Sequence, residues 1–135
     1  MKKLYISCPI EGRDWKDVVK SYKLMHMLAC VAFDEKDLEI INHPKVLDLE
    51  KSKLNDLAIH IANMSTADYF VGVEYCYGPV NQYCNIERGI AHDYGIPHAL
   101  INIELIAPDY RKVVERLEST WDKAEKNVRA KYLEF

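Results

Sequence analysis

Four short runs of β-favouring apolar residues alternate along this chain with segments of helical periodicity. The runs lie at residues 3–8, 38–42, 68–73 and 98–103. The run at 68–73 is almost continuously apolar, which is typical of a central strand buried on both faces of a parallel sheet. A helix between successive strands implies right-handed crossovers. We therefore predict an α/β fold, a three-layer sandwich with a parallel four- to five-stranded, Rossmann-like (flavodoxin-like) sheet.

Capping and breaking residues mark the helix boundaries. Asp14 and Asn85 are good N-cap residues, and Gly95 followed by Pro97 is a strong stop signal. Between these marks, apolar residues recur at intervals of three and four, as they do on the buried face of a helix. The predicted helices run from Trp15 to about Phe33, from near Ser52 onward, from Ile86 to Tyr94, and over a long C-terminal segment, 108–133.

Composition limits the kinds of partner that this chain is expected to have. Its 135 residues suffice for one domain, 1–135, and 49% apolar with 29% charged residues is typical of a folded protein rather than a disordered one. A net charge of -3 argues against a nucleic-acid polymer as partner. No apolar window approaches the length of a membrane span, and the first residues lack the apolar stretch of a signal peptide. We expect a cytoplasmic protein with no membrane partner.

The four cysteines give no sign of a disulfide framework. Cys8, Cys30, Cys76 and Cys84 show no Cys-x-x-Cys spacing, and without an export signal they are expected to be reduced and mostly buried. A structural zinc site made from Cys76, Cys84 and His92 is a weaker alternative.

The loop that follows the first predicted strand has the residues of an anion site. In open parallel sheets, ligands bind at the carboxyl ends of the strands. Gly12 permits a positive φ, and Arg13 places a guanidinium beside the exposed N–H groups at a helix start, which favours phosphate or carboxylate. A tight turn with a solvated arginine is the alternative. The residues expected to contact a ligand here are Ser7, Cys8, Pro9, Ile10, Gly12 and Arg13.

Glu87 is the carboxylate best placed for chemistry. We expect it in the first turn of a helix that follows the most buried strand, where the positive helix end favours the ionised form. An ionised carboxylate at this edge can attack an electron-poor carbon or stabilise an oxocarbenium-like centre. The alternative is a structural glutamate paired with Arg88 or a nearby lysine.

Three blocks of this chain resemble the nucleoside 2-deoxyribosyltransferase-like superfamily. They are Lys3 to Arg13, Ala67 to Val73, and Ile86 to Ala91 with the Tyr-Gly-Ile-Pro of 94–97, so the resemblance covers about residues 3–103. The superfamily includes deoxyribosyltransferases, nucleoside 5'-monophosphate N-glycosidases and small, often phage-encoded proteins. The resemblance implies cleavage or transfer of the N-glycosidic bond of a (deoxy)nucleoside or its 5'-monophosphate, with no metal or other cofactor. It also implies a homo-oligomer, a dimer or higher.

The same resemblance implies roles for individual residues. Glu87 matches the family's nucleophile, which attacks the anomeric carbon of the sugar, and Tyr5 matches the strand tyrosine that orients sugar and nucleophile. Arg13 falls in the loop that binds the 5'-phosphate in the monophosphate-specific branch.

Two departures from the family's pattern affect the expected chemistry. Where the family usually has a catalytic aspartate, this chain has His60, with Asp56 one turn earlier. A histidine can protonate a departing base because its pKa lies near neutrality. The family's glycine-rich loop is replaced by a tyrosine-rich one, whose aromatic rings suit either base stacking or packing against helices. Its expected substrate contacts are Tyr75, Tyr77, Gly78 and Asn81.

These departures keep a second class of function open. The same site would then hold a nucleotide, or a nucleotide-derived defence signal, without cleaving it. The missing aspartate and the tyrosine-rich loop favour this binding protein over an enzyme. In both cases the expected ligand is a small nucleoside or nucleotide.

Overall fold

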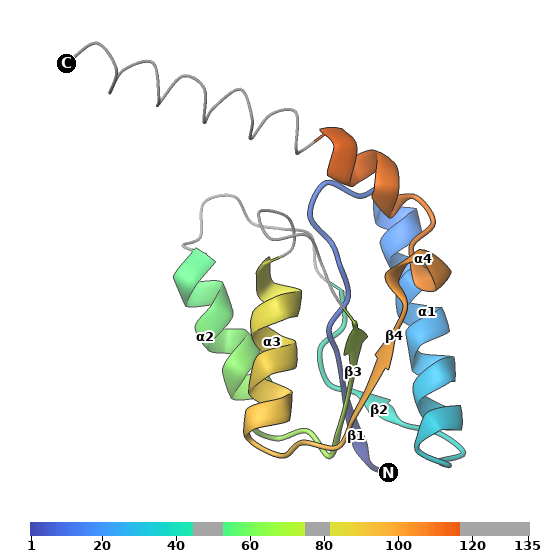
Figure 1. Cartoon of the computed structure of the whole chain (residues 1–135). Coiled ribbons are helices and arrows are strands. Elements are labelled where there is room, and N and C mark those ends of the chain that lie inside the picture. The colour runs from blue at the N-terminus through green and yellow to red at the C-terminus, as the bar shows by residue number, and fades with distance from the viewer. Residues whose placement is uncertain (45–52, 75–81, 117–135) are drawn as a thin grey trace, which may run out of the picture.

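The structure is a computed structural model that describes residues 1–44, 53–74 and 82–116. Figure 1 shows a central sheet with helices on both sides. The elements are β1 (Lys3–Ile6), α1 (Trp15–Ala32), β2 (Glu39–Ile40), α2 (Lys53–Met64), β3 (Tyr69–Val73), α3 (Gln82–Asp93), β4 (His98–Ile101) and α4 (Ile103–Ile106). Residues 110–116 are also helical. No helix in the described part of the chain has the length and apolar character needed to cross a membrane.

The four strands form one parallel sheet in the order β2-β1-β3-β4. The predicted α/β fold and parallel sheet are therefore confirmed. The chain crosses from β1 to β2 on one side and later from β2 over to β3 on the other, so the direction of winding reverses between β1 and β3. In open parallel sheets, ligands bind outside the carboxyl ends of the strands at such a reversal point.

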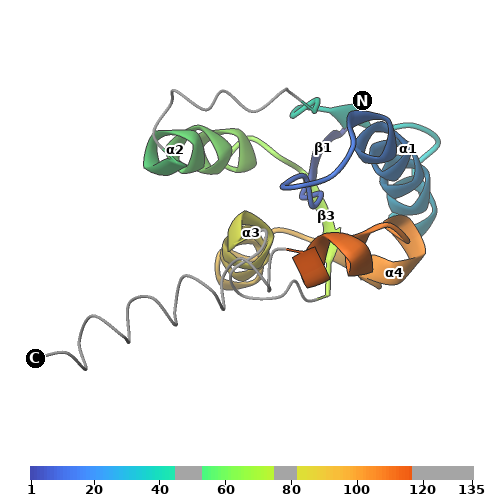
Figure 2. The same ribbon diagram turned by 90° about the horizontal axis from the view of Figure 1, so that it is seen from above.

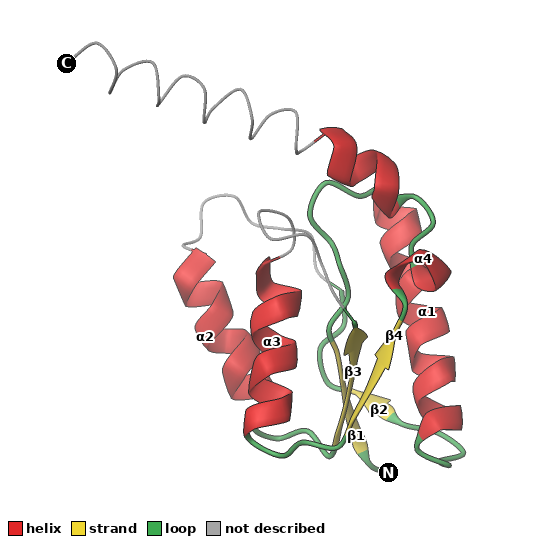
Figure 3. Cartoon of the chain, in the orientation of Figure 1, coloured by secondary structure: helices red, strands yellow, loops and turns green. Residues whose placement is uncertain are grey.

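The helices cover the sheet in two separate layers (Figure 2): α1 and α4 lie on one face, and α2 and α3 lie on the other. Successive side chains of a strand point to opposite faces. Leu4 and Ile6 of β1 thus join the core under α1, and Tyr5 joins Phe70, Met64 and Ala91 in the core under α2 and α3. Burial of both faces explains the nearly continuous apolar sequences of β1 and β3, the two inner strands of the sheet (Figure 3).

Several expected boundaries differ from those observed. Strands β1 and β2 end at Ile6 and Ile40, two residues earlier than the apolar runs at 3–8 and 38–42. Helix α3 begins at Gln82 rather than Ile86, so Asn85 lies inside the helix and is not its cap. The last strand ends at Ile101, because Asn102 caps the short helix α4, its side chain accepting a hydrogen bond from the Glu104 N–H. Of the predicted helix 108–133, residues 110–116 are helical, and 117–133 lie outside the described residues.

Candidate active site

A buried carboxylate lies at the reversal point, where β1 and β3 end. Glu87 of α3 is only 4% exposed. Its Oε2 accepts a hydrogen bond from the Tyr5 hydroxyl, and its Oε1 accepts one from the Ser7 hydroxyl at 3.2 Å. Tyr5 and Ser7 are themselves buried, so the three side chains form one compact group. The predicted proximity of Tyr5 and Glu87 is present in this geometry.

No cation neutralises this carboxylate among the residues that the structure describes. The neighbouring guanidinium of Arg88 points elsewhere, because it donates to the carbonyl oxygens of Val73 (3.2 Å) and Glu74. The alternative of a structural ion pair between Glu87 and Arg88 therefore does not match the arrangement.

The environment of Glu87 sets its acidity. Burial raises the pKa of the Glu87 carboxyl to about 7, and the hydrogen bonds from Tyr5 and Ser7 oppose this rise. The expected position of Glu87 in the first turn of its helix is wrong. Glu87 is in the second turn of α3, which begins at Gln82, and desolvation outweighs the helix dipole. At neutral pH both protonation forms are then populated, as suits a nucleophile or a general acid–base.

Tyr5 acts on Glu87 as a permanent hydrogen-bond donor. Burial and the charge of Glu87 raise the pKa of its phenol well above the ordinary range, so the hydroxyl keeps its proton. The ring stacks on Phe70 with the ring planes 5° apart, which fixes the direction of the hydroxyl.

Gly72 of β3 removes a side chain from the sheet surface next to this group. A Cβ at this position would lie 2.7 Å from Cε1 of Phe70 and 3.5 Å from Cβ of Ser7. Phe70 is fully buried, so its ring has no open side toward which to move. A glycine here is therefore required by close packing beside the site.

Asn42 holds β1 at the level of the site. Its side-chain Oδ1 accepts from the Ile6 N–H at 2.8 Å, and its Nδ2 donates to the Ile6 carbonyl at 2.7 Å. Because β2 ends at Ile40, the Asn42 side chain supplies the two hydrogen bonds that a neighbouring strand would otherwise make to Ile6. It thereby fixes the backbone between Tyr5 and Ser7. The sequence reading did not include Asn42 among site residues. Its place at the end of a predicted strand was the available signal.

The charge of Glu87 acts on two further phenols, Tyr22 and Tyr83. Tyr83 belongs to the tyrosine-rich segment whose rings were expected to suit base stacking, whereas Tyr22 was not expected at the site. Burial raises the pKa of Tyr22 on α1, and negative charge on Cys8, Glu87 and Cys84 adds to the rise. Tyr22 lies on the buried face of α1, a position that favours a role in the core. Burial also raises the pKa of Tyr83 on α3, with smaller contributions from the charges of Asp56, Glu11 and Glu87. The site therefore combines one carboxylate with several hydroxyl groups.

His60 and Asp56 approach the site from α2 by way of Tyr83. The His60 ring meets the Tyr83 ring edge-on, with centroids 5.4 Å apart. Burial lowers the pKa of His60, although the charge of Asp56 opposes this, so the imidazole is neutral at pH 7. Its Nδ1 is buried without a hydrogen-bond partner among the described residues. His60 and Asp56, which were expected to assist the leaving base, make no hydrogen bond to Glu87 in the described part of the chain.

Arg13, the expected phosphate ligand, is engaged in hydrogen bonds within the protein. Its Nε and Nη2 bind the carboxylate oxygens of Asp109 at 2.8 and 3.0 Å. Its remaining N–H groups reach the Pro9 carbonyl at 2.7 Å, the Ser21 hydroxyl at 2.7 Å, and weaker acceptors. The Arg13 side chain has no exposed area. All five donors of the guanidinium are therefore engaged within the protein, and this geometry does not support a phosphate ligand role.

The other predicted contacts divide between described and undescribed residues. Gly12 has a φ of +75°, so the expected left-handed turn is present. Cys8 and Pro9 are buried, and Ile10 is half-buried. Tyr75, Tyr77, Gly78 and Asn81 lie outside the described residues, as does Cys76 of the alternative zinc site.

The chain matches no protein-family model, no curated protein and no solved structure. Its function is therefore inferred from the geometry of the group around Glu87.

Proposed function

We propose that this protein cleaves the N-glycosidic bond of a nucleoside, with Glu87 as the nucleophile. The observation that carries the proposal is a buried carboxylate, held by the Tyr5 and Ser7 hydroxyls and by no described cation, at the ligand-binding edge of the sheet. The resemblance of residues 3–103 to the nucleoside 2-deoxyribosyltransferase-like superfamily supports the same assignment.

The reaction has two steps. A Glu87 oxygen attacks the anomeric carbon, and the base leaves with the electron pair of the glycosidic bond. Water then hydrolyses the glycosyl ester and regenerates the carboxylate, or a second base accepts the sugar. Oε1 is the better attacking atom, because its hydrogen bond from Ser7 is 3.2 Å long and is the weaker of the two. Tyr5 holds the other oxygen and so orients the carboxylate.

The pKa of Glu87 implies a pH dependence for this reaction. Burial raises this pKa to about 7, and only the ionised carboxylate is a nucleophile. The specificity constant kcat/KM is therefore expected to rise with pH up to about 7 and then level off.

The charges around the site favour an uncharged nucleoside over its 5'-monophosphate. Arg13, the expected phosphate ligand, is engaged with Asp109. The phenol of Tyr83 also experiences the charges of Asp56, Glu11 and Glu87, and a 5'-phosphate nearby would be repelled by these acids. We therefore expect nucleosides to be the better substrates.

The experiment is a panel of ribonucleosides, deoxyribonucleosides and their 5'-monophosphates, with free base measured by chromatography. The panel is run with and without an acceptor base. Wild-type protein is expected to release base, and Glu87→Gln is expected to lower the rate by about a thousandfold or more, because it removes the nucleophile. Glu39→Gln is the matched control, because Glu39 is exposed on β2.

Two results would contradict the proposal. One is base release that persists unchanged in Glu87→Gln. The other is tight binding of a nucleotide that is recovered intact after long incubation, which would favour the alternative of a sequestering protein. Homo-oligomerisation, cytoplasmic location and phage origin remain predictions.

A further inference from the structure

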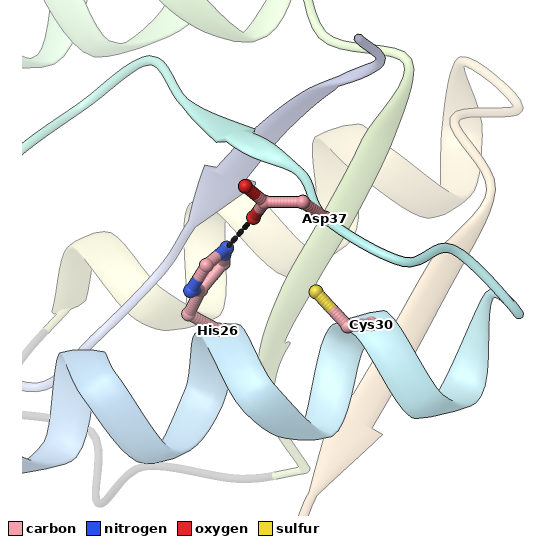
Figure 4. Close-up of side chains that lie close together, drawn as sticks. All are labelled: His26, Cys30 and Asp37. Atoms are coloured by element: carbon pink, nitrogen blue, oxygen red, sulfur yellow. Dashed lines mark ion pairs between the residues drawn. The ribbon is translucent and has the colours of Figure 1, made fainter.

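A second cluster of reactive side chains lies at the opposite, amino end of the sheet. His26 and Cys30 are one turn apart on α1, and Asp37 lies on the loop that leads into β2 (Figure 4). Residues four apart on a helix share a face, so the imidazole and the thiol both point toward Asp37. One ligand atom from each of the three residues lies within 4.8 Å of the others.

The loop that carries Asp37 is held firmly against the rest of the molecule. Asp34 adopts a φ of +53°, which ends α1 and turns the chain back along it. The Glu35 carboxylate then accepts a hydrogen bond from the Tyr69 hydroxyl at 3.0 Å, and Phe33 stacks on the Tyr69 ring with centroids 4.2 Å apart. The position of Asp37 relative to α1 is therefore set by contacts outside the cluster.

Oxygen atoms surround the His26 ring nitrogen that faces Asp37. His26 Nε2 lies 3.3 Å from Asp37 Oδ1 and 2.9 Å from the Leu38 carbonyl oxygen, and the Leu38 N–H donates to Asp37 Oδ1 at 2.8 Å. These contacts hold the imidazole and the carboxylate in place beside the Cys30 thiol.

We propose that His26, Cys30 and Asp37 bind a zinc ion. Imidazole, thiolate and carboxylate are the three side-chain ligands that zinc uses in proteins, whereas Mg²⁺ and Ca²⁺ prefer oxygen alone. Bonds form from zinc to His26 Nε2, to Cys30 Sγ and to an Asp37 oxygen, and water completes a tetrahedron. On binding, His26 Nε2 gives up its hydrogen bond to the Leu38 carbonyl oxygen and the ring proton moves through solvent to Nδ1, while the Cys30 thiol releases its proton to solvent.

The ion would join the last turns of α1 to the loop before β2. Strand β2 has only two residues, Glu39 and Ile40, and lies at the edge of the sheet. A bond between this loop and α1 therefore stabilises the least extensive part of the sheet. The ion lies at the opposite end of the sheet from Glu87, so this proposal does not depend on the proposed function.

The test is metal binding by the full chain under reducing conditions, with Co²⁺ as a spectroscopic probe and Zn²⁺ in competition with a chromophoric chelator. We expect one Co²⁺ per chain, with the thiolate-to-cobalt charge-transfer band that a cysteine ligand produces. Cys30→Ser is expected to abolish the band. His26→Ala and Asp37→Asn are each expected to weaken Zn²⁺ binding by about tenfold or more. Zn²⁺ is also expected to raise the Tm of the wild type and not that of Cys30→Ser.

His98→Ala is the matched control. His98 is an exposed histidine that belongs to no three-residue cluster among the described residues. It is expected to leave Zn²⁺ affinity unchanged. Absence of one-to-one binding would overturn the proposal, as would a charge-transfer band that survives Cys30→Ser. If Cys30→Ser fails to fold, unchanged Zn²⁺ affinity in His26→Ala and Asp37→Asn would overturn it equally.

Discussion

Two carboxylates flank the loop after β1, and their environments are opposite. Asp109 is partly exposed and receives two hydrogen bonds from the Arg13 guanidinium, which hold the pKa of that carboxyl below its ordinary value. Glu87 is buried and receives hydrogen bonds from neutral hydroxyls, and burial raises the pKa of its carboxyl to about 7. Asp109 is neutralised by Arg13. Glu87 has no cationic partner among the described residues, so no opposite charge offsets the free-energy cost of burying its charge.

This difference separates a structural charge from a reactive one. The Arg13–Asp109 pair ties the loop after β1 to the start of the helical segment at 110–116, across 96 positions of sequence. Its charges are satisfied, so they have little tendency to react. Glu87 has a poorly solvated charge whose pKa lies near neutrality, as is common for groups that carry out catalysis.

The largest effect should follow from breaking the satisfied pair. Arg13→Ala leaves Asp109 without its partner and removes the donors to Pro9 and Ser21. We expect the free energy of unfolding to fall by about 3 kcal/mol, at the lower end for buried pairs because Asp109 is 26% exposed. Urea denaturation measures this loss. Base release per folded molecule should change much less than in Glu87→Gln.

Arg111→Ala is the control for this variant. Arg111 pairs with Glu104 at 3.3 Å, but both side chains are more than 70% exposed. Its loss should cost less than about 0.5 kcal/mol, as is usual for surface pairs. Equal losses in the two arginine variants would mean that the Arg13 pair is no more than a surface contact, and the comparison with Glu87 would fail.

A pH-dependent effect on stability, similar in size and opposite in sign, is expected at Glu87. Its pKa is raised from 4.5 to about 7 in the folded protein, so the native state binds more protons than the unfolded state in this range. Stability is therefore fully present below pH 4.5 and is lost as pH rises through about 7, by roughly 3 kcal/mol at most. Asp109 has the reverse sign, because its lowered pKa contributes stability that is lost on acidification.

Glu87→Gln should remove that pH-dependent loss. Urea midpoints at pH 5 and pH 8 are expected to show wild type losing stability between the two, while the variant changes less. At pH 8 the variant should be the more stable protein although it is inactive. Glu39→Gln, at an exposed position, should follow the wild type. A wild type that gains stability from pH 5 to pH 8, in step with Glu87→Gln, would contradict a raised pKa.

Much of the fold follows from sequence patterns of short range. The apolar strands and the helical periods predicted four strands, their parallel arrangement and the edge at which ligands would bind. The family resemblance implied that Tyr5 and Glu87 lie together, and their hydrogen bond is present. Patterns of this kind depend on neighbouring residues, which is why they can be read without coordinates.

The environment of each charge was harder to predict. Arg13 was expected to bind the phosphate of a ligand. Its actual partner, Asp109, lies 96 positions away in the sequence, and no local pattern links the two residues. Glu87 was expected in the first turn of its helix, near the positive helix end, because the helix was predicted to begin at Ile86. Helix α3 begins four residues earlier, at Gln82. Helix boundaries are the least certain part of such an interpretation, and burial depends on contacts between distant elements.

The smallest effect concerns the hydroxyls that distinguish Glu87 from Asp109. Tyr5→Phe keeps the ring that stacks on Phe70 and removes only the hydrogen bond to Oε2. Since that bond lowers the pKa of Glu87, its loss should raise the pKa, and the rising limb of kcat/KM should move to higher pH. A bond to a charged group contributes about 1.5 kcal/mol, so base release at pH 7 should fall by roughly tenfold. Ser7→Ala, which removes the longer bond of 3.2 Å, should move the limb in the same direction but less. If both variants keep the wild-type pH profile, the hydroxyls do not set the acidity of Glu87, and the contrast with Asp109 must arise from burial alone.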